Sequence, residues 1–493
     1  MSNPTPKSMA APGITRSKAE AVNAADTREL YKKREPIYPK LAHGKFRFVK
    51  WVIMALALGV YYLVPFLRWD RGPGAPDQAV LVDFAHGRFY FFFIEIWPQE
   101  IYYVTGLLIM AALGLFLASA LFGRVWCGYA CPQTVWTDLF IMVERMFEGD
   151  RNARMKLDRA PWSLNKAWRK TGKHAVWLVI AFATGGAWIL YFHDAWDTLA
   201  NFFTGTAAPS SYVFAGVLTF TTYTLAGTMR EQVCTYMCPW PRIQAAMTDR
   251  DALNVTYRID RGEPRGAHKK NDSWDNRGDC IDCKQCVAVC PMGIDIRDGA
   301  QLECIQCALC IDACDDIMGK VGRPTGLITY ETDDNIDRFV KGETPRYPFI
   351  RPRTMVYAVS LAIVTALMLG ALVTRTHLEL NSQRDRNPNY VRLSDGGVRN
   401  GYTVNVINKA NAPRVMDLAV EGDPAIGVRI LGAPDLMPGQ IEIGPDRSQD
   451  YVVYLTLPDD AIDGPREEIT FVVTDQETGE TARSPSVLIT GAE

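Results

Sequence analysis

Residues 280–291 read CIDCKQCVAVCP, and residues 304–314 read CIQCALCIDAC. Each stretch carries four cysteines with the spacing C-x2-C-x2-C-x3-C, and a proline follows the fourth cysteine of the first stretch. These eight residues belong to a set of twelve cysteines that all lie between Cys127 and Cys314 of a 493-residue chain. Because thiols in a reducing compartment rarely form structural disulfides, this concentration predicts metal or redox chemistry.

The spacing is typical of bacterial proteins that hold two [4Fe–4S] clusters. In this pattern three closely spaced thiolates bind one cluster, and the fourth cysteine of the stretch binds the other cluster. The first predicted ligand set is Cys280, Cys283, Cys286 and Cys314. The second set is Cys304, Cys307, Cys310 and Cys290. A zinc site is disfavoured, because the cysteine pairs of zinc sites are separated by a longer spacer. Asp315 stands where the first stretch has Pro291, so we expect a different turn and charge beside the first cluster.

The four remaining cysteines form a second repeat. Residues 124–133 read RVWCGYACPQ and residues 231–240 read EQVCTYMCPW, so both contain C-x-Y-x-C-P, and Arg124 and Arg230 lie just upstream. If a helix continues through the motif, the i, i+4 spacing places both sulfurs on one face. The alternative is that these thiols are small buried hydrophobic groups at helix ends. Their repetition favours a redox or soft-metal role for Cys127, Cys131, Cys234 and Cys238.

Five uncharged apolar runs are long enough, or nearly so, to cross a bilayer, which takes about 17–25 residues. They are residues 51–67, 101–122, 175–192, 212–229 and 355–373. Buried helices of a soluble core are a poor alternative, because each run would need burial on all sides. A shorter piece, FYFFFIEIW at residues 89–97, contains Glu95, and we expect it to be interfacial or re-entrant.

The charges of the connecting segments predict the orientation. Residues 123–174 hold ten Lys and Arg, whereas residues 193–211 hold none, which places the first segment in the cytoplasm and the second outside. The basic N-terminal arm, residues 1–46, agrees with this and is expected to be largely disordered by its composition. We therefore expect a multi-pass protein of the bacterial inner membrane, with its N-terminus and clusters in the cytoplasm and its C-terminal region in the periplasm.

The C-terminal region contains no cysteine and changes to short β-rich runs separated by Gly, Pro, Asp and Asn. Seven such runs predict an immunoglobulin-like sandwich, which we interpret as a docking or stability module. The predicted fold is thus a multi-domain membrane protein with an α-helical bundle, an α+β ferredoxin-like domain and an all-β domain. The expected divisions are residues 1–46 (arm), 47–255 (membrane domain), 256–345 (ferredoxin domain), 350–375 (fifth helix) and 385–493 (exported domain).

The two C-x3-C-P pairs, the paired cluster motifs and the stretch CDDIMGKVGRPTGLITYET after the last cluster motif closely resemble the FixG-like cytochrome c oxidase accessory proteins, also called RdxA or CcoG. The resemblance implies a cupric reductase that serves assembly of a cbb3-type oxidase. It would use an external electron donor and a copper carrier or transporter. Soft thiolates favour Cu(I), so Cys127, Cys131, Cys234 and Cys238 become a candidate copper site or electron relay.

Two other functions stay open. One is a quinol-linked electron relay without copper, as in the membrane subunits of nitrate reduction systems, which share the C-x3-C-P pairs. The other is an assembly scaffold whose clusters are structural. The chain lacks a C-x-x-C-H haem motif, a G-x-G-x-x-G fingerprint and a P-loop, so we expect electrons from an outside donor and no nucleic-acid partner.

Overall fold

The computed structural model describes residues 16–23, 35–72, 75–268, 273–410, 412–431 and 439–491. The chain divides into two structural units. The first contains residues 1–67 and 78–368, and the second contains residues 68–77 and 369–493.

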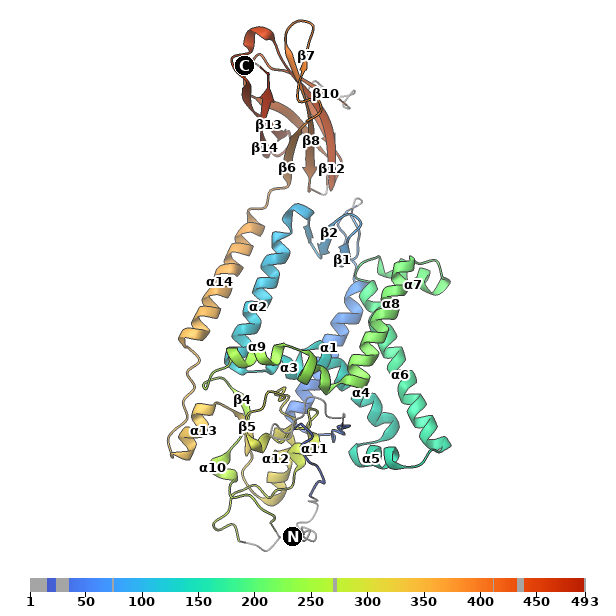
Figure 1. Ribbon diagram of the computed structural model, residues 1–493, viewed down its shortest axis with the longest axis vertical. Coiled ribbons are helices and arrows are strands. Elements are labelled where there is room, and N and C mark those ends of the chain that lie inside the picture. Colours follow the sequence, from blue (N-terminus) through green and yellow to red (C-terminus); the bar gives the residue numbers. More distant parts are fainter. Residues whose placement is uncertain are drawn as a thin grey trace. The chain divides into compact units, whose positions relative to one another are not determined.

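Three helices within the described residues are long and apolar enough to cross a membrane (Figure 1). They are α1 (Lys45–Leu63) with the 3₁₀ turn η2 (Val64–Phe66), α2 (Tyr102–Phe122) preceded by the 3₁₀ turn η3 (Pro98–Glu100), and α14 (Pro352–Val373). Helices α2 and α14 approach closely at Gly106, where an added Cβ would lie 2.1 Å from Sδ of Met368. A small residue is therefore needed at this crossing.

The third and fourth predicted membrane helices are present as α6 (Leu164–Ile189) and α8 (Pro209–Thr222). Helix α6 begins before the predicted apolar run, and its first turns carry Lys166, Arg169, Lys170 and Lys173. Helix α8 is regular for 14 residues and then continues as the π-helical turn η4 (Tyr223–Met229). Neither helix is among those with the length and composition of a membrane span, so the number of five crossings stays a prediction.

Shorter helices connect these long ones. They are α3 (Val125–Tyr129), α4 (Pro132–Glu148), α5 (Arg151–Arg159), α7 (Ala195–Thr204), the π-helical turn η5 (Val233–Met237) and α9 (Trp240–Met247). A buried charge network ties several of them together. Glu144 of α4 lies 3.1 Å from Nη1 of Arg154, 3.4 Å from Nζ of Lys173 and 3.0 Å from Nη2 of Arg230. Buried charges of this kind stabilise only when each has a partner, so the network fixes α4, α5 and α6 together.

Residues 89–97 form strands and not a re-entrant segment, whereas the alternative expectation, an interfacial position, stays a prediction. They belong to an antiparallel sheet of β1 (Val80–Asp83), β2 (Arg88–Phe91) and β3 (Ile94–Ile96). Nη1 of Arg88 lies 3.1 Å from Oε1 of Glu95, so the carboxylate has a cationic partner within the sheet. Pairing between the strands satisfies the backbone N–H and C=O groups of this segment, which a lone segment could not do for itself.

The cluster motifs lie in a small α+β domain of the first unit. Its elements are β4 (Asn254–Tyr257), α10 (Ile259–Gly262), α11 (Gln285–Val289), the 3₁₀ turn η6 (Ile296–Asp298), α12 (Leu309–Val321), β5 (Ile328–Glu331) and α13 (Asp333–Val340). Strands β4 and β5 pair antiparallel, with Asn254 opposite Glu331. Short helices α11 and α12 follow the two cysteine loops, and their buried faces form the core beneath both loops.

The described parts of the N-terminal arm are ordered against this domain. The amide of Ser17 donates to the carbonyl of Cys283 at 2.9 Å, that of Val22 to Gly293 at 2.8 Å, and that of Lys40 to Ala288 at 2.8 Å. These stretches are therefore held in place by acceptors on the ferredoxin domain, and disorder of most of the arm stays a prediction. The rest of the arm, residues 1–15 and 24–34, lies outside the described residues.

The second unit contains a β-sandwich of two antiparallel sheets, one ordered β10-β12-β8-β6 with β7 beside β8, the other β11-β9-β13-β14. Its strands are β6 (Leu378–Arg384), β7 (Val391–Arg392), β8 (Val398–Asn408), β9 (Arg414–Glu421), β10 (Gly427–Leu431), β11 (Gln440–Ile443), β12 (Arg447–Leu457), β13 (Arg466–Asp475) and β14 (Thr481–Ile489), with the 3₁₀ turn η7 (Asp459–Ala461). Fully buried side chains such as Tyr402, Phe471 and Met416 fill the space between the sheets. All seven predicted runs lie in strands. The sandwich begins with β6 at Leu378, earlier than the predicted domain boundary at residue 385.

Candidate iron–sulfur centre and neighbouring thiols

Both cysteine loops have the same unusual backbone. In the first loop, Asp282 and Lys284 flank the second cysteine with φ values of 50° and 56°. In the second loop, Gln306 and Ala308 occupy the equivalent places with φ values of 55° and 60°. Left-handed conformations cost energy for residues other than glycine, so they persist where the surroundings require them. Here they curl each loop so that successive amides face inward, an arrangement that suits an anionic cluster.

The first predicted set of thiols is gathered in one place. Cys280 and Cys286 are each 8% exposed, and Cys283 and Cys314 pack against the same core. Burial raises the pKa of the Cys314 thiol well above its usual value, and the thiols of the other three cysteines raise it further. Such mutual effects require short separations, so the structure brings Cys314 to the first loop.

The second predicted set is gathered in the same way. Burial raises the pKa of the Cys310 thiol well above its usual value, and Cys307, Cys304 and Cys290 raise it further. A small cavity lined by these four cysteines lies between the second loop and the residues that follow Cys290. Both groupings match the sets drawn from the spacing, and the assignment of iron ligands to them stays a prediction.

The chemistry of these donors fits [4Fe–4S] clusters. None of these eight thiols is exposed, and burial raises the pKa of six of them, so free thiolates would be costly here, whereas bound iron deprotonates a thiol outright and balances its charge. Within the described residues, no group of three or more His, Cys, Asp or Glu side chains is placed to hold a single metal ion. Asp315, the residue in place of the motif proline, accepts a hydrogen bond from the amide of Gly326 at 2.8 Å and so joins α12 to the turn before β5.

The first C-x-Y-x-C-P segment lies directly against the second cluster loop. A Cβ on Gly128 would lie 2.8 Å from the carbonyl oxygen of Ile305 and 2.9 Å from that of Gln306. The hydroxyl of the buried Tyr129 donates to the carbonyl of Cys307 at 3.4 Å. Glycine and tyrosine of the motif thus make the contact with the iron–sulfur domain.

Arg124 holds this contact together. Its guanidinium donates to the carbonyls of Leu302 and Cys304 on the second cluster loop, the latter at 3.3 Å, and to the carbonyl of Pro241 after the second thiol motif at 2.6 Å. Its amide donates to Oε1 of Gln306 at 2.6 Å. Arg124 was singled out only as a neighbour of the motif, and its contact with two separate segments was not predicted.

The structure brings the four thiols of the two motifs near one another. Burial raises the pKa of Cys127 to about 12, and the thiols of Cys131, Cys234 and Cys238 raise it as well. Cys127 and Cys234 also pack on the apolar core that contains Cys307. The two motifs therefore meet beside the second cluster loop.

The helices do not continue through the motifs, contrary to one expectation. Helix α3 ends at Tyr129, and Cys131 has extended backbone angles of −60° and 128° as the residue before α4. The turn η5 ends at Met237, and Cys238 has similar angles of −79° and 122°. The following prolines favour this extended conformation in the residue before them, so the two sulfurs of a pair do not share a helix face.

Gln244 is a site residue that the sequence did not reveal. Its side chain is completely buried, and its Oε1 accepts a hydrogen bond from Sγ of Cys127 at 3.3 Å. Its Nε2 donates to Oγ of Ser119 at 3.1 Å. Gln244 lies on α9, outside both motifs. Its role can be recognised only in the folded chain, where α9 lies against Cys127 of the first motif.

Comparisons with known proteins agree with this arrangement. A family described as "4Fe-4S dicluster domain" matches residues 229–333, which include the second thiol motif and all eight predicted iron ligands. A family described as "4Fe-4S binding domain" matches residues 104–147, which include the first thiol motif. A third, "IG-like fold at C-terminal of FixG", matches residues 368–491.

Three similar proteins cover most of the chain. "Nitrogen fixation protein FixG" of Rhizobium meliloti is 52% identical over 484 residues, which span 92% of this chain and 92% of that protein. "Protein RdxB" of Cereibacter sphaeroides is 53% identical and covers 83% of this chain and 86% of its own. "Protein RdxA" of the same organism is 50% identical and covers 87% of this chain and 91% of its own.

Proposed function

This chain belongs to the FixG and RdxA family, and we propose that it is a membrane-bound iron–sulfur oxidoreductase that reduces Cu(II) to Cu(I) for assembly of a cbb3-type oxidase. Its resident cofactors would be two [4Fe–4S] clusters, and copper would be its substrate. The loop charges support a cytoplasmic position for the clusters and thiols and a periplasmic position for the β-sandwich. The copper would pass to a carrier or transporter and from there to the oxidase.

One observation carries this proposal: Cys127 and Cys234 pack on the same apolar core as Cys307, Cys290, Cys304 and Cys310. The candidate copper thiols and the predicted ligands of the second cluster are thus neighbours. When bound, the clusters would supply single electrons, which matches the one electron that separates Cu(II) from Cu(I).

The side chains of the two motifs would bind the substrate. Thiolates are soft ligands and favour Cu(I), so they would stabilise the product of the reduction over its starting ion. Cys238 is the exposed member of the four, whereas the other three are half-buried. It would therefore receive the incoming ion and release the product, while Cys127 and Cys234 face the cluster loop.

The test replaces Cys127, Cys131, Cys234 and Cys238 by Ser in the full-length protein, purified without oxygen. The eight predicted iron ligands lie elsewhere, so we expect unchanged iron and sulfide contents and normal reduction by dithionite. A hydroxyl is a poor ligand for Cu(I), so Cu(I) affinity should fall by more than tenfold, and reduction of stoichiometric Cu(II) by the reduced protein should slow. Copper binding and reduction like those of the parent would overturn the copper proposal.

The same preparations discriminate the alternatives. A quinol-linked relay predicts rapid reduction of the clusters by a soluble quinol analogue and no thiol-dependent copper binding. A scaffold predicts normal oxidase assembly in cells that carry Cys283→Ser or Cys307→Ser. Each of these single changes should lower the iron content from about eight atoms toward four, or remove both clusters if the domain unfolds.

A further inference from the structure

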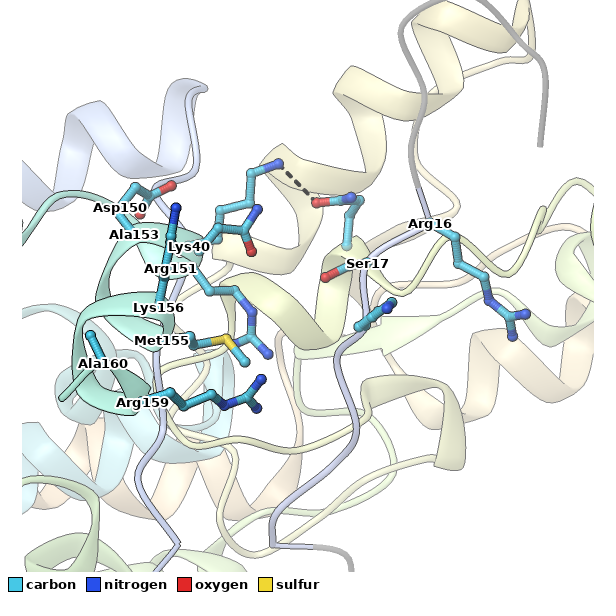
Figure 2. Close-up of a pocket in the computed structure, with 13 residues that line it drawn as sticks. Arg16, Ser17, Lys40, Asp150, Arg151, Ala153, Met155, Lys156, Arg159 and Ala160 are labelled. Atoms are coloured by element: carbon cyan, nitrogen blue, oxygen red, sulfur yellow. Dashed lines mark hydrogen bonds between the residues drawn. The ribbon is translucent and has the colours of Figure 1, made fainter. Parts of the chain in front are cut away.

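A wide basic pocket lies on the first unit, apart from the thiols. Its volume is about 1020 Å³, and Figure 2 shows α5 on one side of it and the stretch that carries Arg16 and Ser17 on the other. Six cationic residues line it: Arg16, Lys18, Lys40, Arg151, Lys156 and Arg159. The structure describes every residue of this lining, and Asp150 is the one acidic residue among them.

One of these six cations, Arg16, is paired with Asp282 of the first cluster loop, whereas three others have no charged partner among the residues that the structure describes. Within the described part of the chain, the side chains of Lys18, Lys156 and Arg159 make no hydrogen bond and no ion pair, and all three are exposed. Arg151 donates to the carbonyl of Tyr38 at 2.6 Å, which leaves its charge uncompensated. The pocket therefore attracts anionic groups.

The carboxylate of Asp150 is already engaged at the pocket edge. Its Oδ1 accepts a hydrogen bond from the amide of Leu41 at 3.0 Å and lies 3.6 Å from Nε of Arg145. The carboxylate of Asp150 thus holds Leu41 and Arg145 in place and offsets little of the positive charge of the pocket lining.

The first cluster motif contributes one residue, Gln285, to the lining of the pocket, and the pocket's N-terminal stretch is bonded to that motif. Ser17 donates its amide to the carbonyl of Cys283 at 2.9 Å, and Nζ of Lys40 donates to Oε1 of Gln285 at 3.0 Å. Cys283 is half-buried, whereas Cys280 and Cys286 are buried. The pocket therefore lies beside Cys283, one of the two half-buried cysteines of the first predicted set. The copper-facing thiols, in contrast, lie beside the second set.

The surroundings favour a protein partner over a lipid headgroup. On the predicted five-helix topology, the apolar part of α6 crosses the membrane from near Ala175, and residues 164–174 extend the helix beyond it by about 16 Å at 1.5 Å per residue. Helix α5 is joined to the far, basic end of this extension by residues 160–163 (Figure 1). Anionic headgroups at the membrane surface would be more than a Debye length away, which is about 10 Å at 0.1 M salt.

We propose that this pocket docks an acidic one-electron carrier protein of the ferredoxin or flavodoxin type, and that this carrier delivers its electron at the first cluster. The step is a single transfer in which the carrier is oxidised by one electron and the first cluster is reduced by one. This inference rests on the proposed function only for the presence of the clusters, because it holds whether the final acceptor is copper or another molecule. Opposite charges speed such encounters and make them sensitive to salt.

The test uses the full-length protein with its clusters and a plant-type [2Fe–2S] ferredoxin as the acidic probe. The charge-reversal variant is Lys156→Glu with Arg159→Glu, two exposed residues whose side chains make no contact that the fold needs. The matched control is Lys341→Glu with Arg346→Glu, which reverses two exposed cations near α13, outside the pocket. Two quantities are measured at low salt: the Kd of the oxidised probe, and the rate at which the reduced probe reduces the clusters.

We expect the pocket variant to weaken binding and to slow reduction by at least tenfold, and the control to change either by less than twofold. Raising the salt should erase the difference between the two variants. Dithionite should reduce both variants to the same final extent, and copper reduction from the dithionite-reduced state should be unchanged, which separates this proposal from the copper proposal. Equal effects of the two variants on the probe would overturn the proposal. So would a loss of binding to vesicles containing phosphatidylglycerol with no change toward the probe, which would assign the pocket to lipid.

Discussion

The two C-x-Y-x-C-P segments have nearly the same letters and very different surroundings. In the first, Tyr129 is 7% exposed and bonds to the second cluster loop. In the second, Tyr236 is 51% exposed and Met237 is 56% exposed. The first segment is therefore part of the interface with the iron–sulfur domain, and the second offers an accessible surface. We interpret the first as the side that receives electrons and the second as the side that exchanges copper.

The backbone shows how the repeat was specialised. Counted from the first cysteine of each motif, Gly123 corresponds to Arg230, and both bend the chain with positive φ values of 58° and 45°. Arg124 corresponds to Glu231, so the two upstream arginines are not equivalent, contrary to their apparent match in sequence. Arg124 reaches the cluster loop, whereas Arg230 pairs with Glu144 among the buried charges. The bend and the thiols are shared, and the contacts around them differ.

The largest expected effect comes from exchanging one residue between the motifs. Gly128 corresponds to Thr235, and a Cβ at Gly128 would collide with two backbone oxygens that cannot move aside. Gly128→Thr should therefore separate the first motif from the second cluster loop, at a cost of about 1–3 kcal/mol or more. We expect the iron content to fall from about eight atoms toward four.

The matched control is Thr235→Gly in the second motif. The hydroxyl of Thr235 donates to the carbonyl of Glu231 within its own turn at 2.9 Å, so its loss should cost about 1 kcal/mol, mainly through backbone entropy, and leave the iron content unchanged. Iron analysis and electron paramagnetic resonance of both variants decide the matter. Equal iron loss in the two variants would show that the motifs are equivalent and would break the comparison.

A smaller effect should separate the two arginines. Arg124→Met removes a charged donor from the carbonyls of Cys304, Leu302 and Pro241, so we expect a loss of about 1.5–3 kcal/mol in stability. Removing this positive charge also disfavours the reduced second cluster, so its midpoint potential should become more negative. Arg230→Met leaves Glu144 with two other cations and should lower stability by less, with no change of potential.

Redox titration followed by electron paramagnetic resonance and thermal unfolding measure the two effects. If Arg230→Met shifts the cluster potential as much as Arg124→Met does, the second motif is coupled to the cluster as closely as the first. The assignment of distinct roles would then fail.

Local patterns predicted the parts of this molecule that depend on local sequence. The spacing of Cys280 to Cys290 predicts the cluster loop, and the alternation in the C-terminal runs predicts the strands. Both predictions succeed because each pattern is complete within a few residues. The bracing by Arg124 joins residues 178 positions apart, and no local signal marks such a contact. The strands at residues 89–97 were not predicted for a related reason: a short apolar run does not tell a strand from a re-entrant segment without its pairing partners.

The smallest expected effect concerns Gln244, which touches only the first motif. Its Oε1 accepts a hydrogen bond from the protonated thiol of Cys127, and a hydrogen bond to the neutral form disfavours the charged form that copper requires. Gln244→Met removes the acceptor with little change in volume, so the Cu(I) affinity of the first pair should rise by up to about fivefold, the equivalent of about 1 kcal/mol. The change is measured by chelator competition in two backgrounds, one lacking the second pair (Cys234→Ser with Cys238→Ser) and one lacking the first (Cys127→Ser with Cys131→Ser). The rise should occur only where Cys127 is present. Two outcomes would contradict this: an equal change in both backgrounds, or a fall in affinity in the background that lacks the second pair. Either would mean that Gln244 acts on a site shared by both pairs, and the assignment of different roles to the two motifs would be wrong.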